Sequence, residues 1–363
     1  AGWLNSVRLR AAYGASGVQP GATAALALVQ VGQSTLNGVS TPVANLSSLG
    51  NPDLKPERRT EFETGVDGEL FNQRLRLEAT YYNKLSRDAL LTLPLSPEVG
   101  IATRTVNIGK LRNSGVEALV SATMFDVPVA SLTVTLNGSV NRNRVEALNV
   151  PNLDFIGSPS YRIKAGYPIG GIFGPRIASI DDDGDGIVEA GEVTLEGDAD
   201  TYLGTVQPTR QLTLGGSLSL FRNQLRVSTQ FDYRGGMVIH NNIGGTRDAL
   251  GNSRAVNDPT SSLERQAAAI VRNGITGYVE NAAFTRWREL SVMYNLPAAV
   301  LRRAGASSAS ITLTGRNLAL FTHYSGVDPE GNDGLLFQTE GYADGGQGLP
   351  QTRYWMIRLN LGF

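Results

Sequence analysis

The chain has 363 residues, a formal net charge of -1 and no cysteine. Disulfides and thiolate metal sites are therefore excluded, and no basic face for nucleic acid is expected. Hydrophobic residues make up 41% of the chain, yet no apolar run approaches the roughly 18 residues that a transmembrane helix requires. The choice is between a soluble protein and a barrel that crosses a membrane with strands.

Strands are predicted along the whole chain wherever apolar residues occupy alternate positions, because successive side chains of a strand point to opposite faces. We expect about ten to twelve such strands. The clearest, in chain order, are Val7–Tyr13, Phe62–Leu70, Leu75–Tyr82, Val116–Met124, Leu132–Asn141, Leu212–Leu220, Leu225–Arg234, Leu290–Leu296, Ile311–Ala319 and Arg353–Phe363.

The last predicted strand has one apolar and one polar face and ends on an aromatic residue. Trp355, Ile357 and Leu359 share the apolar face, while Arg358 and Asn360 share the other. A strand of about ten residues is long enough to cross a bilayer when it is tilted. The pattern is typical of the strands of an outer-membrane β-barrel.

The connections alternate between short and long. Short links join the strands in pairs, and the pairs are separated by long segments, at 16–56, 86–112, 145–210, 237–285 and 321–349. Outer-membrane barrels have tight periplasmic turns and extended outer loops. The alternation predicts an antiparallel barrel whose carboxyl terminus lies in the periplasm. Any further strands within 145–210 would have to come in pairs, and the number of such strands stays open; 161–176 is a candidate for half of one hairpin.

Charged residues fall mostly on the polar faces of these strands, which would line the lumen. Arg or Lys that faces lipid at the midplane costs roughly 2 to 4 kcal/mol, so this distribution favours a barrel over a soluble sandwich. Long irregular segments are also uncommon in soluble domains.

Several short motifs in a fixed order resemble the SusC/RagA-like, TonB-linked outer-membrane importers (TonB-dependent receptors or transporters). The motifs run from Asn51 to Arg353. They are Asn51-Pro-Asp-Leu-Lys-Pro-Glu57, Asn113-Ser-Gly-Val-Glu117, Gly166-Tyr-Pro-Ile-Gly170, the Asp-rich loop 181–192, Tyr278-Val-Glu-Asn281, Arg286-Trp-Arg-Glu-Leu290, Leu313-Thr-Gly-Arg-Asn-Leu318, Tyr324-Ser-Gly-Val-Asp-Pro329 and Leu349-Pro-Gln-Thr-Arg353.

The resemblance implies an all-β, antiparallel transmembrane barrel of about 22 strands with an N-terminal plug. It implies that residues 1–363 are the C-terminal portion of that barrel, without the plug and the N-terminal strands. Such importers take up oligosaccharides or peptides in the outer membrane of a Gram-negative-type bacterium. The implied partners are outer-membrane lipid, a SusD-like surface lipoprotein, TonB acting through the plug, and the remaining barrel strands.

Two other functions stay open on the sequence. One is a self-contained small outer-membrane barrel, either a passive porin or a hydrolase. The other is a calcium-stapled extracellular structural or adhesion module. Pairing of the first strand with the last would identify a closed ten-stranded barrel.

The segment from Asp181 to Glu192 matches a twelve-residue calcium loop, in which oxygen ligands recur at positions 1, 3, 5, 7, 9 and 12 and a glycine makes the sharp turn at position 6. Gly186 is that glycine. The flanking residues show no helical period, so we expect an isolated structural Ca²⁺ site in an outer loop. Its ligands would be Asp181, Asp183, Asp185, the carbonyl of Ile187, Glu189 and Glu192.

No catalytic site is predicted. The chain has two histidines, His240 and His323, both in long segments, and the nearest acidic candidates for a dyad are Asp232 and Asp328. No nucleophile-elbow spacing accompanies them. The chain is expected not to be an enzyme.

Overall fold

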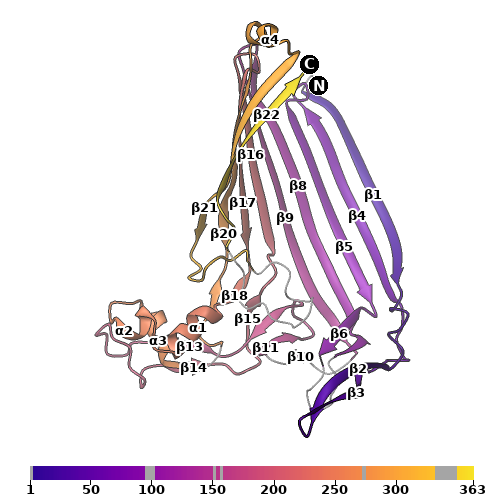
Figure 1. Ribbon diagram of the computed structural model, residues 1–363, viewed down its shortest axis with the longest axis vertical. Coiled ribbons are helices and arrows are strands. Elements are labelled where there is room, and N and C mark those ends of the chain that lie inside the picture. The colour runs from indigo at the N-terminus through magenta and orange to yellow at the C-terminus, as the bar shows by residue number, and fades with distance from the viewer. Residues whose placement is uncertain (1–2, 95–102, 150–152, 156–157, 272–274, 332–349) are drawn as a thin grey trace.

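Ten long antiparallel strands form one curved sheet in the computed structural model, which describes residues 3–94, 103–149, 153–155, 158–271, 275–331 and 350–363 (Figure 1). Each strand pairs with its sequence neighbours among the ten, in the order β1-β4-β5-β8-β9-β16-β17-β20-β21-β22. The strands are β1 (Leu4–Val18), β4 (Glu57–Leu70), β5 (Leu75–Arg87), β8 (Gly109–Val127), β9 (Ala130–Leu148), β16 (Arg210–Leu220), β17 (Leu225–Gly235), β20 (Phe284–Asn295), β21 (Ser308–Thr322) and β22 (Tyr354–Gly362).

All ten strands that the alternation predicts are therefore confirmed, and most extend beyond the predicted bounds. Among the described residues, the segment 145–210 adds no pair of strands to the large sheet, because β9 pairs directly with β16, with Leu136 opposite Leu214. The short strands of that segment hydrogen-bond among themselves instead.

The register places apolar side chains on one face of the sheet and polar ones on the other. Val66 lies opposite Ala79, whereas Asp67 lies opposite Glu78. Outward apolar side chains such as Leu9 and Ile357 are 79% and 74% exposed. Side chains so exposed and so apolar are suited to lipid, not water.

Short turns join the strands at one end of the sheet, where both chain termini also lie (Figure 1). Two of these turns, at Asn72 and at Asn223, use left-handed backbone, with φ of 56° and 67°. Asn tolerates this region better than most residues. The last turn contains helix α4 (Ala298–Ala304), which ends at Gly305 with φ of 65°.

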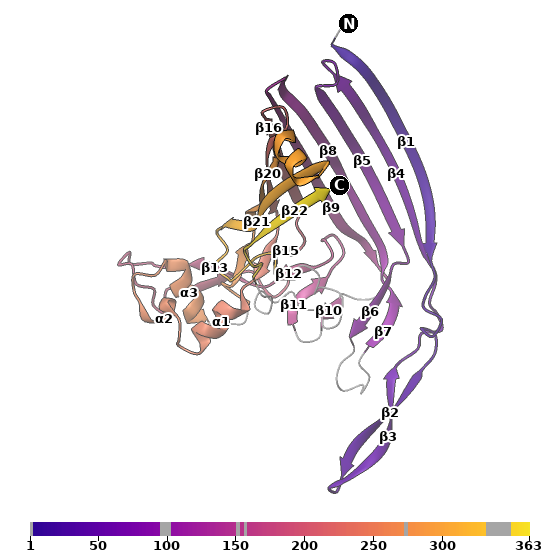
Figure 2. The same cartoon turned by 45° about the horizontal axis from the view of Figure 1, so that its top comes forward.

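Long segments at the opposite end carry the remaining elements, and the β2–β3 hairpin projects away from the sheet (Figure 2). The short strands are β2 (Leu28–Leu36), β3 (Val39–Ser48), β6 (Leu90–Pro94), β7 (Thr103–Asn107), β10 (Leu153–Phe155), β11 (Ser158–Ile163), β12 (Gly171–Phe173), β13 (Arg176–Ser179), β14 (Thr194–Glu196), β15 (Tyr202–Thr205), β18 (Val238–His240) and β19 (Val279–Asn281). The helices are α1 (Asn242–Ala249), α2 (Arg254–Asn257) and α3 (Leu263–Val271).

Two buried apolar clusters lie at this end, among the long segments and the adjoining start of β20. One cluster comprises Ile172, Val206 and Ile275. A second joins Met237, Ile239, Ala282, Phe284 and Tyr324. The loop end is thus a packed layer that the sheet supports.

The sheet is open, because in the described chain β1 and β22 are its two edges and do not pair with each other. The described strands therefore do not form a closed ten-stranded barrel, which was one of the alternatives that the sequence allowed. Among the described residues, no helix has both the length and the apolar character to cross a membrane.

Candidate functional site

The Asp-rich loop folds around its own carboxylates. Oxygen atoms of Asp181, Asp183 and Asp185 lie within 4.8 Å of one another. The backbone N–H groups of Gly184 and Gly186 donate to the Asp181 carboxylate at 2.9 and 3.2 Å, and Gly186 adopts a φ of 84°. The sequence therefore brings the first three predicted ligands together, with a glycine at the turn.

Glu192 closes the loop by reaching back over it. Its carboxylate accepts hydrogen bonds from the backbone N–H groups of Asp182 at 3.1 Å and Glu189 at 2.8 Å. Ile187 donates its N–H to Asp185 at 2.7 Å. The side chain of Glu189 is exposed and is not grouped with the three aspartates.

The flanks of this loop are strands, as the absence of a helical period predicted. β13 enters the loop and β14 leaves it, and the two pair with Ile177 opposite Leu195. The loop is thus a β-hairpin tip and lacks the paired helices of a calcium sensor.

The hairpin tip is seated on helix α3 through Gln266, which is only 6% exposed. Gln266 Oε1 accepts the N–H of Val188 at 3.0 Å, and its Nε2 donates to the carbonyls of Gly186 at 3.2 Å and Ser261 at 2.8 Å. Val188 itself is buried, at 6% exposure. One amide side chain therefore holds both the loop and the start of α3.

Helices α1 and α3 are joined by a buried polar centre. Asp248, fully buried, has its Oδ2 2.9 Å from the hydroxyl of Tyr278 and 3.3 Å from Nη2 of Arg265. The Tyr278 hydroxyl also lies 3.0 Å from the carbonyl oxygen of Ala268. This centre fixes the helical platform that carries Gln266.

Arginines on the inner face of β20 anchor the segment that follows β21. Arg286, 3% exposed, pairs with Asp328 at 2.6 Å and with Glu330 at 2.9 Å. Arg288 pairs with Asp232 at 2.6 Å and also contacts Glu330. Both carboxylates that the sequence placed near histidines are therefore held by arginines: His323 is exposed, and His240 ends β18.

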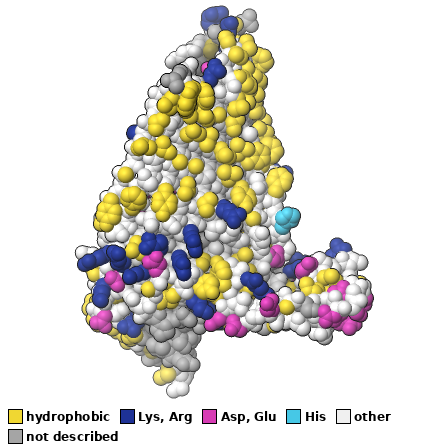
Figure 3. All heavy atoms as spheres, turned by 180° about the vertical axis from the view of Figure 1, so that it is seen from behind, with side chains coloured by type: hydrophobic (Ala, Val, Ile, Leu, Met, Phe, Trp, Pro, Cys, Tyr) yellow, Lys and Arg dark blue, Asp and Glu magenta, His cyan; other side chains and the backbone are white. Residues whose placement is uncertain are grey.

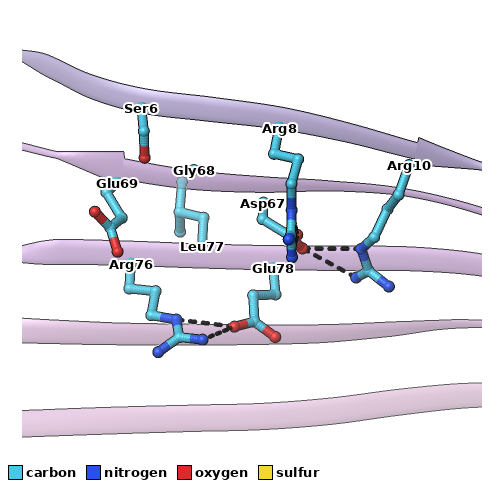
Figure 4. A pocket seen from close by; sticks show the side chains of 9 residues that line it. All are labelled: Ser6, Arg8, Arg10, Asp67, Gly68, Glu69, Arg76, Leu77 and Glu78. Atoms are coloured by element: carbon cyan, nitrogen blue, oxygen red, sulfur yellow. Dashed lines mark hydrogen bonds and ion pairs between the residues drawn. The ribbon is translucent and has the colours of Figure 1, made fainter.

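A charged hollow of about 510 Å³ opens on the inner face of β1, β4 and β5, towards the short-turn end (Figure 4). Arg8 and Arg10 both reach Asp67, at 2.7 and 3.0 Å. Arg76 pairs with Glu78 on its own strand. In this hollow, residues of opposite charge therefore lie side by side on the inner face of the sheet.

Carboxylates on the inner face of β4 are paired by the strands on either side of it, as Asp67 and Glu61 show. The partners of Asp67 come from β1, which the register sets beside β4 with Arg8 opposite Asp67. Glu61 pairs with Lys84 of β5 at 3.5 Å. The polar residues on alternate positions of β1 indicate that this strand has a polar face. Only the strand order shows that this face supplies the partners of Asp67.

The helical platform was also missed. Residues 237–285 were expected to be irregular, yet they contain α1, α2 and α3. Two of these helices begin after residues that are typical N-caps and could have been recognised in the sequence. Asn241 accepts the N–H of Gly244, and Ser253 accepts that of Val256. Gly244 and Gly245 lie within α1, and because glycine is unfavourable in a helix the sequence of α1 does not indicate one.

Comparisons with known proteins agree with this architecture. Residues 1–318 match the family model for the TonB-dependent receptor-like β-barrel. TonB-dependent receptor P26 of Formosa agariphila is 26% identical over 99% of this chain and 40% of its own length; receptor P3 of the same organism is 28% identical over 91% and 36%. The chain thus spans about two-fifths of these relatives.

Solved structures share the fold. The RagAB peptide transporter superposes with a TM-score of 0.78 at 22% identity, covering 100% of this chain and 41% of that one. The RagAB peptide importer in its open-open state gives 0.72 at 23% identity. With a family model that covers most of its length and a sheet of the matching architecture, the chain belongs to the TonB-dependent receptor-like β-barrel family of outer-membrane proteins.

Proposed function

We propose that this chain forms the C-terminal portion of the barrel of a SusC/RagA-like, TonB-dependent importer of oligosaccharides or peptides. The observation that carries the proposal is the open sheet of ten strands, apolar outside and charged inside, with one packed loop end. An open edge is not tolerated in lipid, so further strands must complete the barrel. A plug within that barrel would be the element that contacts TonB.

Uptake measurements test this proposal and separate the two substrate classes. Cells that carry or lack the gene would be given fluorescent oligopeptides or fluorescent oligosaccharides, with and without a protonophore. We expect gene-dependent uptake of one class that the protonophore abolishes. Uptake that persists without the proton-motive force would indicate a passive porin instead.

We also propose that a SusD-like surface lipoprotein covers the loop end. The layer of α1, α3 and the small sheets gives this end a broad, ordered surface, and RagAB is a neighbour in fold. When the tagged full-length protein is purified, we expect a lipoprotein to be recovered with it in stoichiometric amount. Recovery of the barrel alone from gently solubilised membranes would contradict this partner.

The direction of insertion is part of the proposal, with the short turns and the carboxyl terminus in the periplasm. Its support is the length asymmetry of the connections, since outer-membrane barrels keep their short turns inside. An epitope placed in the β2–β3 hairpin should be labelled on intact cells, and one placed in the β16–β17 turn should not. The reverse pattern would overturn the orientation.

We further propose that the loop 181–192 binds Ca²⁺. Clustered carboxylates repel one another without a cation, and hard oxygen donors at these spacings are those that Ca²⁺ prefers. Ligands would come from Asp181, Asp183, Asp185, Glu192 and the Ile187 carbonyl, with Glu189 acting directly or through water. The ion would staple the hairpin tip against α3.

Calcium binding can be measured by titration calorimetry on the purified protein. The D183N/D185N variant should lose the binding isotherm, whereas Glu196→Gln, an exposed carboxylate on β14 outside the loop, should retain it. Chelation should also speed proteolysis within 181–192 without unfolding the barrel. Equal cleavage with and without chelator would contradict calcium binding at this loop.

A further inference from the structure

The outward face of the sheet carries charge in one place only. At the long-loop end, outward register positions of β4, β5, β8, β9 and β16 hold basic residues, here called the outward basic belt. The belt comprises Arg58, Arg87, Lys110, Arg112, Arg142, Arg144 and Arg210.

The belt follows directly from the strand register. Phe62, Tyr81 and Val140 are outward apolar side chains, 45%, 42% and 57% exposed. Even steps along the same strands towards the long loops lead to Arg58, Arg87 and Arg142, which share their face. Figure 3 shows Lys and Arg side chains gathered below a broad field of hydrophobic side chains on this side of the molecule.

Like charges stand directly opposite one another within the belt. Arg58 is the register partner of Arg87, and Arg87 is in turn the partner of Lys110. Arg112 is opposite Arg144. Directly opposed like charges destabilise a sheet, and a bound anion would offset this repulsion.

The described strands supply almost no such partner themselves. None of the outward register positions of the ten strands carries Asp or Glu. Glu146, next to the register shift in β9, pairs with Arg112. One carboxylate leaves a large excess of positive charge in the belt.

The position and composition of the belt indicate the class of anion that would bind there. It borders the apolar surface, which is the depth at which lipid head groups meet the hydrocarbon region. Six of its seven members are arginines, and guanidinium groups match phosphate oxygens in bidentate geometry. Acyl chains of the same lipid would lie on the adjoining apolar side chains, such as Phe62 and Val66.

We propose that the outward basic belt binds the phosphorylated head group of a lipid in the outer leaflet. A lipid is favoured over a soluble protein partner because charged and apolar contacts are offered together on one continuous surface. This inference rests on the proposed orientation, with the long loops outside. It does not depend on the transported substrate or on TonB.

The test is lipid binding to the full-length barrel, purified in a nonionic detergent, with fluorescent diphosphorylated lipid A as the probe. The R58Q/R87Q/K110Q variant removes three charges that form one row across β4, β5 and β8, with Arg87 between the other two. Juxtamembrane basic residues each strengthen the binding of anionic lipid about fivefold, so the loss of three should weaken binding about 100-fold. The matched control, R74Q/R222Q/R302Q, removes the same charge at the short-turn end and should bind within about threefold of the native protein.

Two further measurements distinguish binding of the phosphorylated lipid from binding of phosphate alone. Dephosphorylated lipid A should bind equally weakly to native and variant barrels, and inorganic phosphate at the same concentration should not displace the probe. Equal binding of both lipids by the native barrel, or displacement by free phosphate alone, would overturn the proposal. If the triple variant fails to show the folded, heat-modifiable band, R142Q/R144Q replaces it, with the same expected direction of change.

Discussion

Replacing Asp328 with Asn should loosen the segment after β21 while leaving the sheet intact. The carboxylate accepts three hydrogen bonds: from Arg286 Nη2 at 2.6 Å, from the Glu330 N–H at 2.9 Å and from the Gln351 N–H at 3.1 Å. Both Arg286 and Asp328 have side chains that are 3% and 2% exposed. A change here therefore acts in a desolvated environment.

The expected magnitude lies between two limits. Breaking a buried ion pair costs about 3 to 5 kcal/mol, and a hydrogen bond to a charged group is worth about 1.5 to 3 kcal/mol. Arg286 keeps Glu330 as a second partner at 2.9 Å, and Asn keeps an oxygen for one backbone N–H. We therefore expect a loss of about 3 kcal/mol, which corresponds to a roughly 100-fold faster opening.

Hydrogen exchange over residues 324–331, followed by mass spectrometry, measures this opening. Glu289→Gln is the matched control. Glu289 lies on β20, as Arg286 does, and its pair with Arg316 of β21 is exposed, with side chains 32% and 48% exposed. Exposed pairs contribute about 0.2 to 1 kcal/mol, so the control should change exchange by less than about fivefold. Exchange no faster in Asp328→Asn than in this control would refute the reasoning, as would equal loss of protection throughout β20 and β21.

Three further changes test other parts of the structure. Gln266→Ala removes hydrogen bonds to the calcium-type loop and should raise its proteolysis roughly 30-fold, for a loss of about 2 kcal/mol, while the β2–β3 hairpin is cleaved as before. Hydrogen bonds from Thr260 and then Arg254 hold the pKa of Asp258 at about 2, below its ordinary 3.8, so its local stabilisation is present above pH 3.8 and is lost as the pH falls through about 2. Exchange protection of residues 254–261, corrected for intrinsic rates, should follow that course and should be low at every pH in Asp258→Asn. Gly115→Ala would place a methyl group within 2.6 Å of a tyrosine hydroxyl on the neighbouring strand and should cut the yield of folded barrel, whereas Gly215→Ala, whose nearest neighbour is 3.9 Å away, should not.

The strands could be predicted because their signal is local. In β22 the alternation of Trp355, Ile357 and Leu359 is complete within a few residues, and the register with β21 then follows from the faces. The same holds for the calcium-type loop, whose three aspartates lie within five residues and converge on one point. Such features need no knowledge of distant segments.

Contacts between distant segments could not be predicted in this way. Gln266 is 78 residues from Val188, and nothing near either residue indicates that an amide will accept that N–H. Asp67 is bound by arginines 57 and 59 residues away. Pattern gives the face on which a side chain lies, but only the strand order and the packing of the loop layer give its partner.

The two edge strands connect these observations to the whole barrel. β1 is exposed along its entire length, on its polar as well as its apolar face, so the hydrogen-bonding groups of its outer edge need another strand. β22 is the second open edge. Its outward side chains Ile357 and Leu359 extend the apolar outer face of the sheet up to that edge. If the chain lies in lipid, as proposed above, neither edge can stay unpaired, and the charged hollow lies on the inner face next to the β1 edge. The strands that complete this sheet should therefore continue both patterns from its edges, apolar residues outward and charged residues towards the lumen.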